Sequence, residues 1–152
     1  LLDYMTVGEN VAFALERRRV APRERAAMVD RALESAALDS TDGLKMPDEL
    51  SGGMRKRAGI ARAIALRPPV LLYDEPTTGL DPVTTYQIDG LVRSLQRAEG
   101  VTSLVVSHDL ASVRRIADRV AFLHRGSVVF TGPFDAFVHD EHPAIRETVG
   151  HA

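Results

Sequence analysis

The feature that most constrains the fold is a short apolar run, Val70–Tyr73, which follows two prolines and leads directly into two acids, Asp74 and Glu75. Apolar runs of this length are typical of central strands in a parallel sheet, which are buried on both faces. Open α/β sheets bind ligands at the carboxyl ends of such strands. We therefore expect an α/β fold in which the two acids lie at a ligand-binding edge.

Two adjacent carboxylates at a strand end suit metal-assisted chemistry. One can hold Mg²⁺, usually through water, while the other orients an attacking water. A second strand is expected over residues 102–106, and His108 follows it closely. Because the carboxyl ends of parallel strands share one edge, His108 is expected near the acid pair. The simpler alternatives are two solvated acids and a histidine with a structural hydrogen bond.

A helix is expected to begin directly after Ser51. Serine is a good N-cap, and Gly52 and Gly53 leave backbone N–H groups uncovered by side chains. Alanines recur at helical spacing between positions 58 and 65. The partial positive charge at such a helix end suits a phosphate, although an ordinary capped helix would explain the same residues.

Taken together, these segments resemble the ATP-binding cassette (ABC) ATPases. Leu50–Met54 is similar to the family's signature motif, with Met54 where glutamine is more usual. Val70–Glu75 resembles the Walker B strand with its catalytic glutamate, Gly79–Pro82 the D-loop, and His108 the switch histidine. The four motifs occur in the family's order. The resemblance covers essentially all 152 residues, but only the later part of a cassette.

The resemblance implies a site shared between two subunits. In the family, two cassettes meet head to tail with ATP between them. Ser51, Gly52 and Gly53 would then contact the γ-phosphate of a nucleotide held by the second ATPase subunit. Asp81 in the D-loop would link the two sites across the dimer.

On the chain's own nucleotide, the resemblance implies ATP with Mg²⁺ as cofactors. Asp74 would position the Mg²⁺, and Glu75 would polarise the attacking water. His108 would contact the γ-phosphate and sense it. Phosphoryl transfer depends mainly on positioning and charge neutralisation, so sharing these groups between subunits would couple hydrolysis to dimer closure.

The implied architecture is the later part of a P-loop NTPase cassette. Its expected parts are a helical subdomain with the signature helix over about 1–66, a parallel-sheet core over about 67–132 that ends in a β-hairpin, and terminal helices over about 133–152. Residue patterns support the helical part, because Thr6 and Glu9 have capping-box spacing. A second helix is expected from Pro22. Its expected buried stripe consists of Ala26, Val29, Ala32, Leu33, Ala36 and Ala37.

The family's P-loop, G-x-x-x-x-G-K-[ST], does not occur in these 152 residues. The Q-loop glutamine and the adenine-stacking aromatic are also absent from the matching place. A truncated chain or fragment is the simplest interpretation, and we expect it not to hydrolyse ATP appreciably alone.

The composition limits the classes of partner that the chain is expected to bind. Nineteen basic and 21 acidic side chains give a net charge of −2, which argues against a general nucleic-acid binder. No apolar run reaches membrane-spanning length, and no signal peptide is visible. Any connection to a membrane must therefore come through a partner. The family resemblance implies a peripheral protein at the cytoplasmic face of the inner (plasma) membrane, attached through integral membrane permease subunits.

The segment Leu1–Phe13, with the signature variant and Arg55–Arg57, is most similar to the ATPases of MCE-type systems. These systems move phospholipids or other hydrophobic compounds between bacterial membranes, and they would add an MCE-domain protein to the partners. ATPases of importers for amino acids, metals or other solutes share much of this pattern. A non-transport ABC ATPase acting on DNA or ribosomes, and a catalytically silent binding subunit, also remain open.

Overall fold

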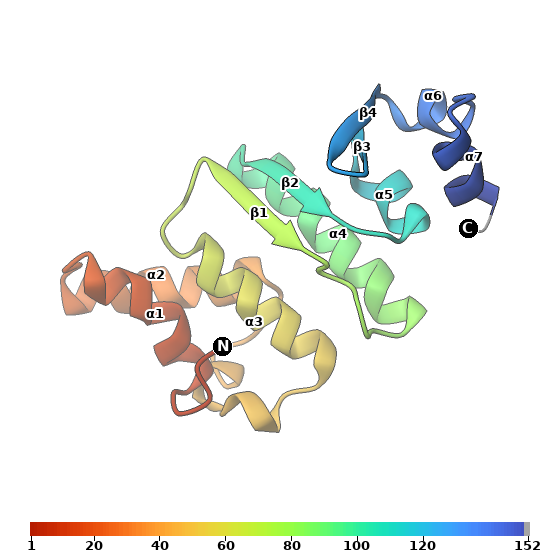
Figure 1. Ribbon diagram of the computed structural model, residues 1–152. Coiled ribbons are helices and arrows are strands. Elements are labelled where there is room, and N and C mark those ends of the chain that lie inside the picture. The colour runs from red at the N-terminus through yellow and green to blue at the C-terminus, as the bar shows by residue number, and fades with distance from the viewer. Residues whose placement is uncertain (151–152) are drawn as a thin grey trace. The chain divides into compact units, whose positions relative to one another are not determined.

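The computed structural model describes residues 1–150, which form two compact units: residues 1–106, and the residues from Ser107 onward (Figure 1). The first unit contains α1 (Val7–Arg17), α2 (Pro22–Ser35), the 3₁₀ turns η1 (Asp42–Leu44) and η2 (Pro47–Glu49), α3 (Gly52–Ile64), β1 (Val70–Asp74), α4 (Pro82–Glu99) and β2 (Thr102–Val106). The second contains α5 (Leu110–Ile116), β3 (Val120–His124), β4 (Ser127–Gly132), α6 (Phe134–Val138) and α7 (Pro143–Gly150).

Helix α1 begins with the predicted capping box. The amide of Glu9 donates to the Thr6 hydroxyl at 3.2 Å, and the amide of Thr6 donates to the Glu9 carboxylate at 2.7 Å. The predicted stripe on α2 is partly wrong, because Ala26 and Ala37 are exposed. Ala32 and Leu33 are buried in the core, and Val29 is partly buried against it. Ala37 lies beyond the helix in a left-handed conformation, with φ of 56°.

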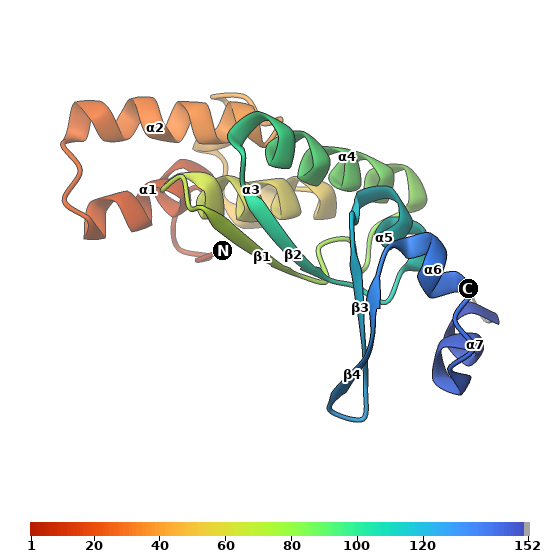
Figure 2. The same cartoon turned by 90° about the horizontal axis from the view of Figure 1, so that it is seen from above.

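Strands β1 and β2 pair in parallel and are joined through α4. Parallel neighbours need a long crossover, and an α-helix usually supplies it. The apolar stripe of α4, which consists of Ile88, Leu91, Val92 and Leu95, is buried. The helix ends at Gly100 in a left-handed C-cap with φ of 64°. Leu71 and Tyr73 of β1 join the buried residues of α3 and α4 in one core. Figure 2 shows both helices alongside the two strands.

The opposite face of the same two strands is apolar and exposed. Alternate residues Val70 and Leu72 on β1, and Leu104 and Val106 on β2, keep between 50% and 74% of their surface accessible. The prediction that β1 is buried on both faces is therefore wrong for this chain. Among residues 1–106, helices cover only one face of the sheet, so alternate side chains on the other face are exposed.

In the second unit, β3 and β4 form the predicted antiparallel hairpin. Its turn, Arg125–Gly126, has positive φ at both residues (48° and 80°), which matches the right-handed twist of hairpin strands. Phe137 of α6 is 1% exposed and packs against the rings of Phe122 and Phe130, each with a centroid separation of 5.5 Å. This aromatic cluster fixes α6 on the hairpin.

The first turn of α3 packs closely against α4. A Cβ atom added to Gly53 would lie 2.5 Å from the Thr84 side-chain methyl group, and one added to Gly52 would lie 3.3 Å from Leu80. Gly59 on the same helix has open space around it. Close packing against Thr84 therefore leaves no room for a side chain at position 53. This constraint is independent of the phosphate binding that the motif suggests.

We expect Gly53→Ala to lower the free energy of unfolding by about 1–3 kcal/mol, because overpacking forces neighbouring atoms to move. The matched control Gly59→Ala should raise it by roughly 0.5–1 kcal/mol, since alanine is the better helix former. Denaturant unfolding measures both values. Adding Thr84→Ser, which removes the clashing methyl group, should restore part of the loss. Equal effects of the two glycine substitutions would contradict this account.

Candidate functional site

Glu75 follows Asp74 at the carboxyl end of β1 and is held through its backbone and its side chain. Its amide donates to the carbonyl of Val106 on β2 at 2.9 Å. Its carbonyl accepts from the ammonium of Lys56 on α3 at 2.9 Å. The hydroxyl of Thr78 donates to its carboxylate at 2.8 Å. Glu75 is thus tied to a neighbouring strand, to a helix and to the turn that follows it.

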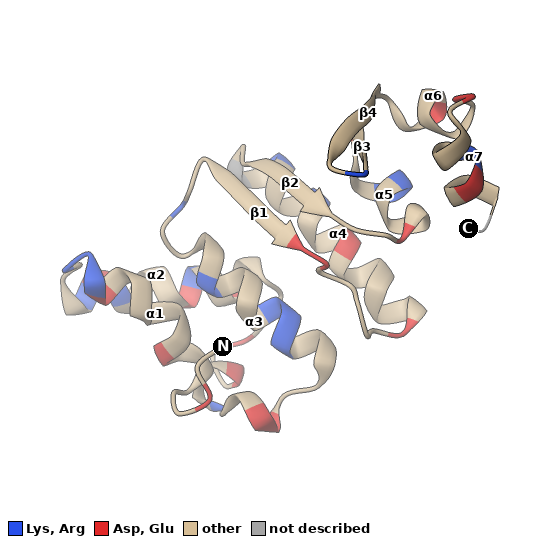
Figure 3. Cartoon of the chain, viewed as in Figure 1, with Lys and Arg blue, Asp and Glu red and all other residues tan. Residues whose placement is uncertain are grey.

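These contacts hold Glu75 in an unusual conformation. Its φ is 47°, in the left-handed region that costs a residue with a Cβ atom about 1–2 kcal/mol. Strained residues of this kind persist where the surroundings fix them, and they concentrate at functional sites. Asp74 is exposed and makes no ion pair with another described residue. Figure 3 shows these acids at the end of β1 and basic residues on α3.

The turn at Ser51 has the geometry that its sequence predicts. The Ser51 side chain is exposed and caps α3 by accepting the amide of Met54 at 3.3 Å. Among the described hydrogen bonds, none uses the amides of Gly52 and Gly53. The turn therefore presents an open helix N-terminus to solvent, although Gly53 itself is buried against α4.

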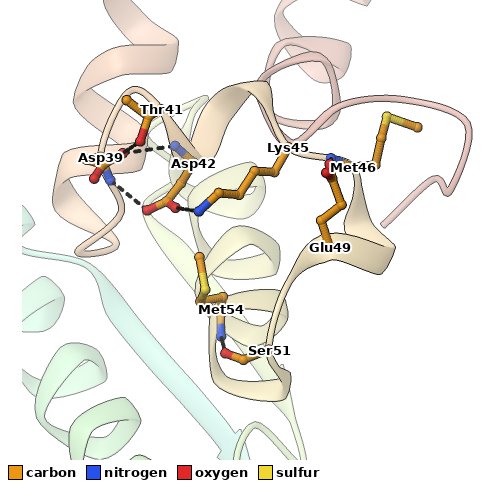
Figure 4. Close-up of polar contacts among 8 residues, drawn as sticks. All are labelled: Asp39, Thr41, Asp42, Lys45, Met46, Glu49, Ser51 and Met54. Atoms are coloured by element: carbon orange, nitrogen blue, oxygen red, sulfur yellow. Dashed lines mark hydrogen bonds and ion pairs between the residues drawn. The ribbon is translucent and has the colours of Figure 1, made fainter.

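The polar segment before this turn is ordered by local hydrogen bonds and contains two 3₁₀ turns, η1 and η2 (Figure 4). The Thr41 hydroxyl and the amide of Asp42 donate to the Asp39 carboxylate, at 2.6 and 2.9 Å. The Lys45 ammonium contacts the Asp42 carboxylate at 2.6 Å. The amide of Met46, at the start of η2, donates to the Glu49 carboxylate at 2.6 Å. This network fixes the entry to α3, and short polar residues at local spacing are the signal for it.

Asp81 caps the other helix of this region, α4. One carboxylate oxygen accepts the amides of Val83 and Thr84, both at 3.0 Å, and the other accepts the Thr84 hydroxyl. The hydrogen bonds from Thr84, followed by that from Val83, lower the pKa of Asp81 below its ordinary value of 3.8. The carboxylate therefore has a structural role as an N-cap, besides the link between sites that the D-loop resemblance implies.

We expect the capping contribution of Asp81 to depend on pH. A carboxyl with a lowered folded-state pKa stabilises the fold above its unfolded pKa, and the contribution is lost as the pH falls through the folded pKa. Asp81→Asn should therefore be less stable than the wild type at pH 7, and this difference should shrink below about pH 3.8. Denaturant unfolding at both pH values measures it. Asp48→Asn is the control, and a difference that is independent of pH would contradict the expectation.

His108 lies in the second unit, two residues after the end of β2. Its neighbour Asp109 caps α5 by accepting the amides of Ala111 and Ser112, at 2.8 and 3.1 Å. Asp74 and Glu75 belong to the first unit. The convergence of His108 with these acids therefore stays a prediction.

Comparison of the sequence with known protein families identifies the family of this chain. Residues 1–78 match the sequence profile of the family described as ABC transporter. The chain belongs to the ABC transporter family. It is a portion of an ATP-binding cassette with the predicted fold class: a parallel sheet with helices and a small antiparallel hairpin.

Relatives of this cassette include methionine import ATP-binding proteins named MetN. The one from Xanthomonas campestris is 42% identical, over all of this chain and 45% of its own length. The one from Thermobifida fusca is 48% identical, over 87% of this chain and 41% of its own length. The chain thus spans less than half the length of these relatives.

Solved structures show the same fold. A dimeric ATP-binding cassette in a post-hydrolysis state, bound to ADP and Pi, superposes with a TM-score of 0.76 at 33% identity. The match covers 88% of this chain and 59% of that one. The named relatives support the amino-acid importer alternative better than the MCE-type interpretation.

The contacts of Lys56 and Thr78 with Glu75 are not predicted from the sequence. Lys56 stands within a basic run, which is typical of a solvated helix face. Thr78 follows the acid pair with no pattern of its own. The signal that could have pointed to Thr78 is its position three residues after Glu75, the separation at which a turn brings a hydroxyl back to a carboxylate.

Proposed function

We propose that this cassette is part of the ATP-hydrolysing subunit of an ABC importer, and that its cargo is an amino acid, with methionine as the first candidate. The cargo class rests on the relatives named as methionine import proteins. The observation that carries the hydrolytic role is Glu75, held in a fixed left-handed conformation beside Asp74 at the strand end.

The acid pair suits Mg²⁺–ATP. Mg²⁺ is usually held by one or two carboxylates together with water and substrate phosphates, and the exposed Asp74 offers one such carboxylate. Bound Mg²⁺ would neutralise charge that develops on the phosphates. Glu75 would orient the attacking water and accept its proton. The nucleotide's main phosphate cradle would come from residues outside this sequence, because no P-loop occurs in it.

In the complete ATPase, Glu75→Gln should lower kcat by about 100-fold or more, since it removes a base while keeping a similar shape. ATP binding should change little. Steady-state hydrolysis and equilibrium binding of labelled ATP measure the two effects. Asp48→Asn, a carboxylate change on η2, serves as the control. Unchanged turnover in Glu75→Gln would remove Glu75 from this role.

The open helix end at Ser51 is proposed to face the nucleotide of a second ATPase subunit. Support comes from its exposure, and from the related cassette that was solved as a dimer. Backbone N–H groups at a helix start bind phosphate well, because they combine hydrogen-bond donors with the positive end of the helix dipole. Asp81 would lie at the same contact between subunits, and His108 would reach the γ-phosphate of the chain's own nucleotide.

Ser51→Arg should block this contact in the complete ATPase by filling the space in front of the helix end. We expect loss of ATP-dependent dimerisation, measured by size-exclusion chromatography with light scattering, and a fall in hydrolysis of about 100-fold. Ser51→Ala is the control for loss of the N-cap, because it removes the cap without filling the space in front of the helix. It should lower the free energy of unfolding by only about 1 kcal/mol. Normal dimerisation of the arginine variant would reject this assignment.

Attachment to a membrane is proposed to occur through permease subunits. Among residues 1–150, the structure has no helix that is both long and apolar enough to cross a bilayer. Cargo identity can be tested by uptake of radiolabelled methionine in cells with and without the gene. A phospholipid or other hydrophobic cargo would instead leave methionine uptake unchanged and alter the lipid distribution between membranes.

A further inference from the structure

Lys56, near the start of α3, is the one basic residue of this helix with a described contact to the acid pair. It is half-buried, and its ammonium donates to the backbone carbonyl of Glu75 at 2.9 Å. Among the described residues, this carbonyl is its hydrogen-bond acceptor, and no carboxylate forms an ion pair with it. The neighbouring basic residues also donate to uncharged acceptors, Arg55 to the Leu50 carbonyl and Arg57 to the Ala37 carbonyl. Lys56 differs from them in that its acceptor belongs to the acid pair.

The carbonyl that Lys56 contacts belongs to the strained residue of the site. Within its own turn, this oxygen accepts the amide of Thr78 only through a long hydrogen bond of 3.4 Å. Lys56 supplies a second and shorter contact, at 2.9 Å, from the second turn of α3. The charge strengthens the bond, because hydrogen bonds from charged donors are shorter and stronger than neutral ones.

We propose that Lys56 is a positioning residue for Glu75, holding its backbone so that the carboxylate faces the attacking water. The proposal rests on the proposed hydrolytic function. It also connects two parts of α3, since the helix capped by Ser51 carries in its second turn the donor that fixes Glu75. Contact of a second subunit's nucleotide with the helix start would then be transmitted to the catalytic carboxylate of this chain.

The test uses the complete ATPase with Lys56→Met, which keeps the apolar stem and removes the donor. We expect kcat to fall about 10- to 100-fold, the size of effect that misplacement of a catalytic group produces. KM for ATP should stay within about twofold, because the interaction is needed for the chemical step rather than for substrate binding. Lys56→Arg, which retains a charged donor, should recover most of the activity.

Arg62→Met is the matched control. Arg62 lies in the last turn of α3, 5.7 Å above the ring of Phe13, and has no described contact with Glu75. Its substitution removes a positive charge from the same helix and should leave kcat unchanged. Thermal unfolding of every variant shows whether the fold is intact. If Lys56→Met does not fold, Lys56→Leu, which also lacks a donor, replaces it under the same criteria.

A double substitution separates this proposal from the proposed function. If Lys56 acts through Glu75, then Lys56→Met should lower kcat no further in a Glu75→Gln background. Full activity of Lys56→Met, a parallel rise in KM, or the same loss in both backgrounds would overturn the positioning role. If Glu75→Gln itself keeps full activity, the proposed function fails, and the Lys56 proposal fails with it.

Discussion

The parallel pairing of β1 with β2 is the interaction on which the site depends. It aligns Asp74 with Val106 at the ends of the two strands, and the carbonyl of Val106 then receives the amide of Glu75. That hydrogen bond fixes where the chain leaves the sheet. The left-handed conformation of Glu75 and its hydrogen bond with Thr78 occur directly after this point. The acid pair thus owes its position to backbone pairing as much as to side-chain chemistry.

Helix α3 also holds this edge of the sheet in place through its contacts with α4 and with the end of β1. Its first turn is pressed against α4 at Gly53 and Thr84, so the helix start cannot shift without disturbing α4. Its second turn reaches the strand end through Lys56. Asp81 fixes the start of α4 by capping it. The Ser51 turn, the start of α4 and the acid pair are therefore connected by direct contacts inside one unit.

Much of the fold could be predicted from the sequence, because its signals are local. The capping box at Thr6, the cap at Ser51, the stripe of α4 and the hairpin turn all depend on residues within a few positions of each other. The exposure of Leu72 could not be predicted, since an apolar run looks the same whether one face or both faces are covered. The contact of Lys56 with Glu75 joins residues 19 apart in the chain, so no periodic pattern reports it.

The two-stranded sheet has a further consequence for how such a chain behaves in solution. Each strand has a pairing partner on one side only among the described residues, and one face of the sheet is apolar and open. Open strand edges offer unpaired backbone groups that can pair with another chain. A sheet of this kind is a template for strand addition. Unless another segment supplies the missing neighbours, copies of the chain will tend to associate edge to edge.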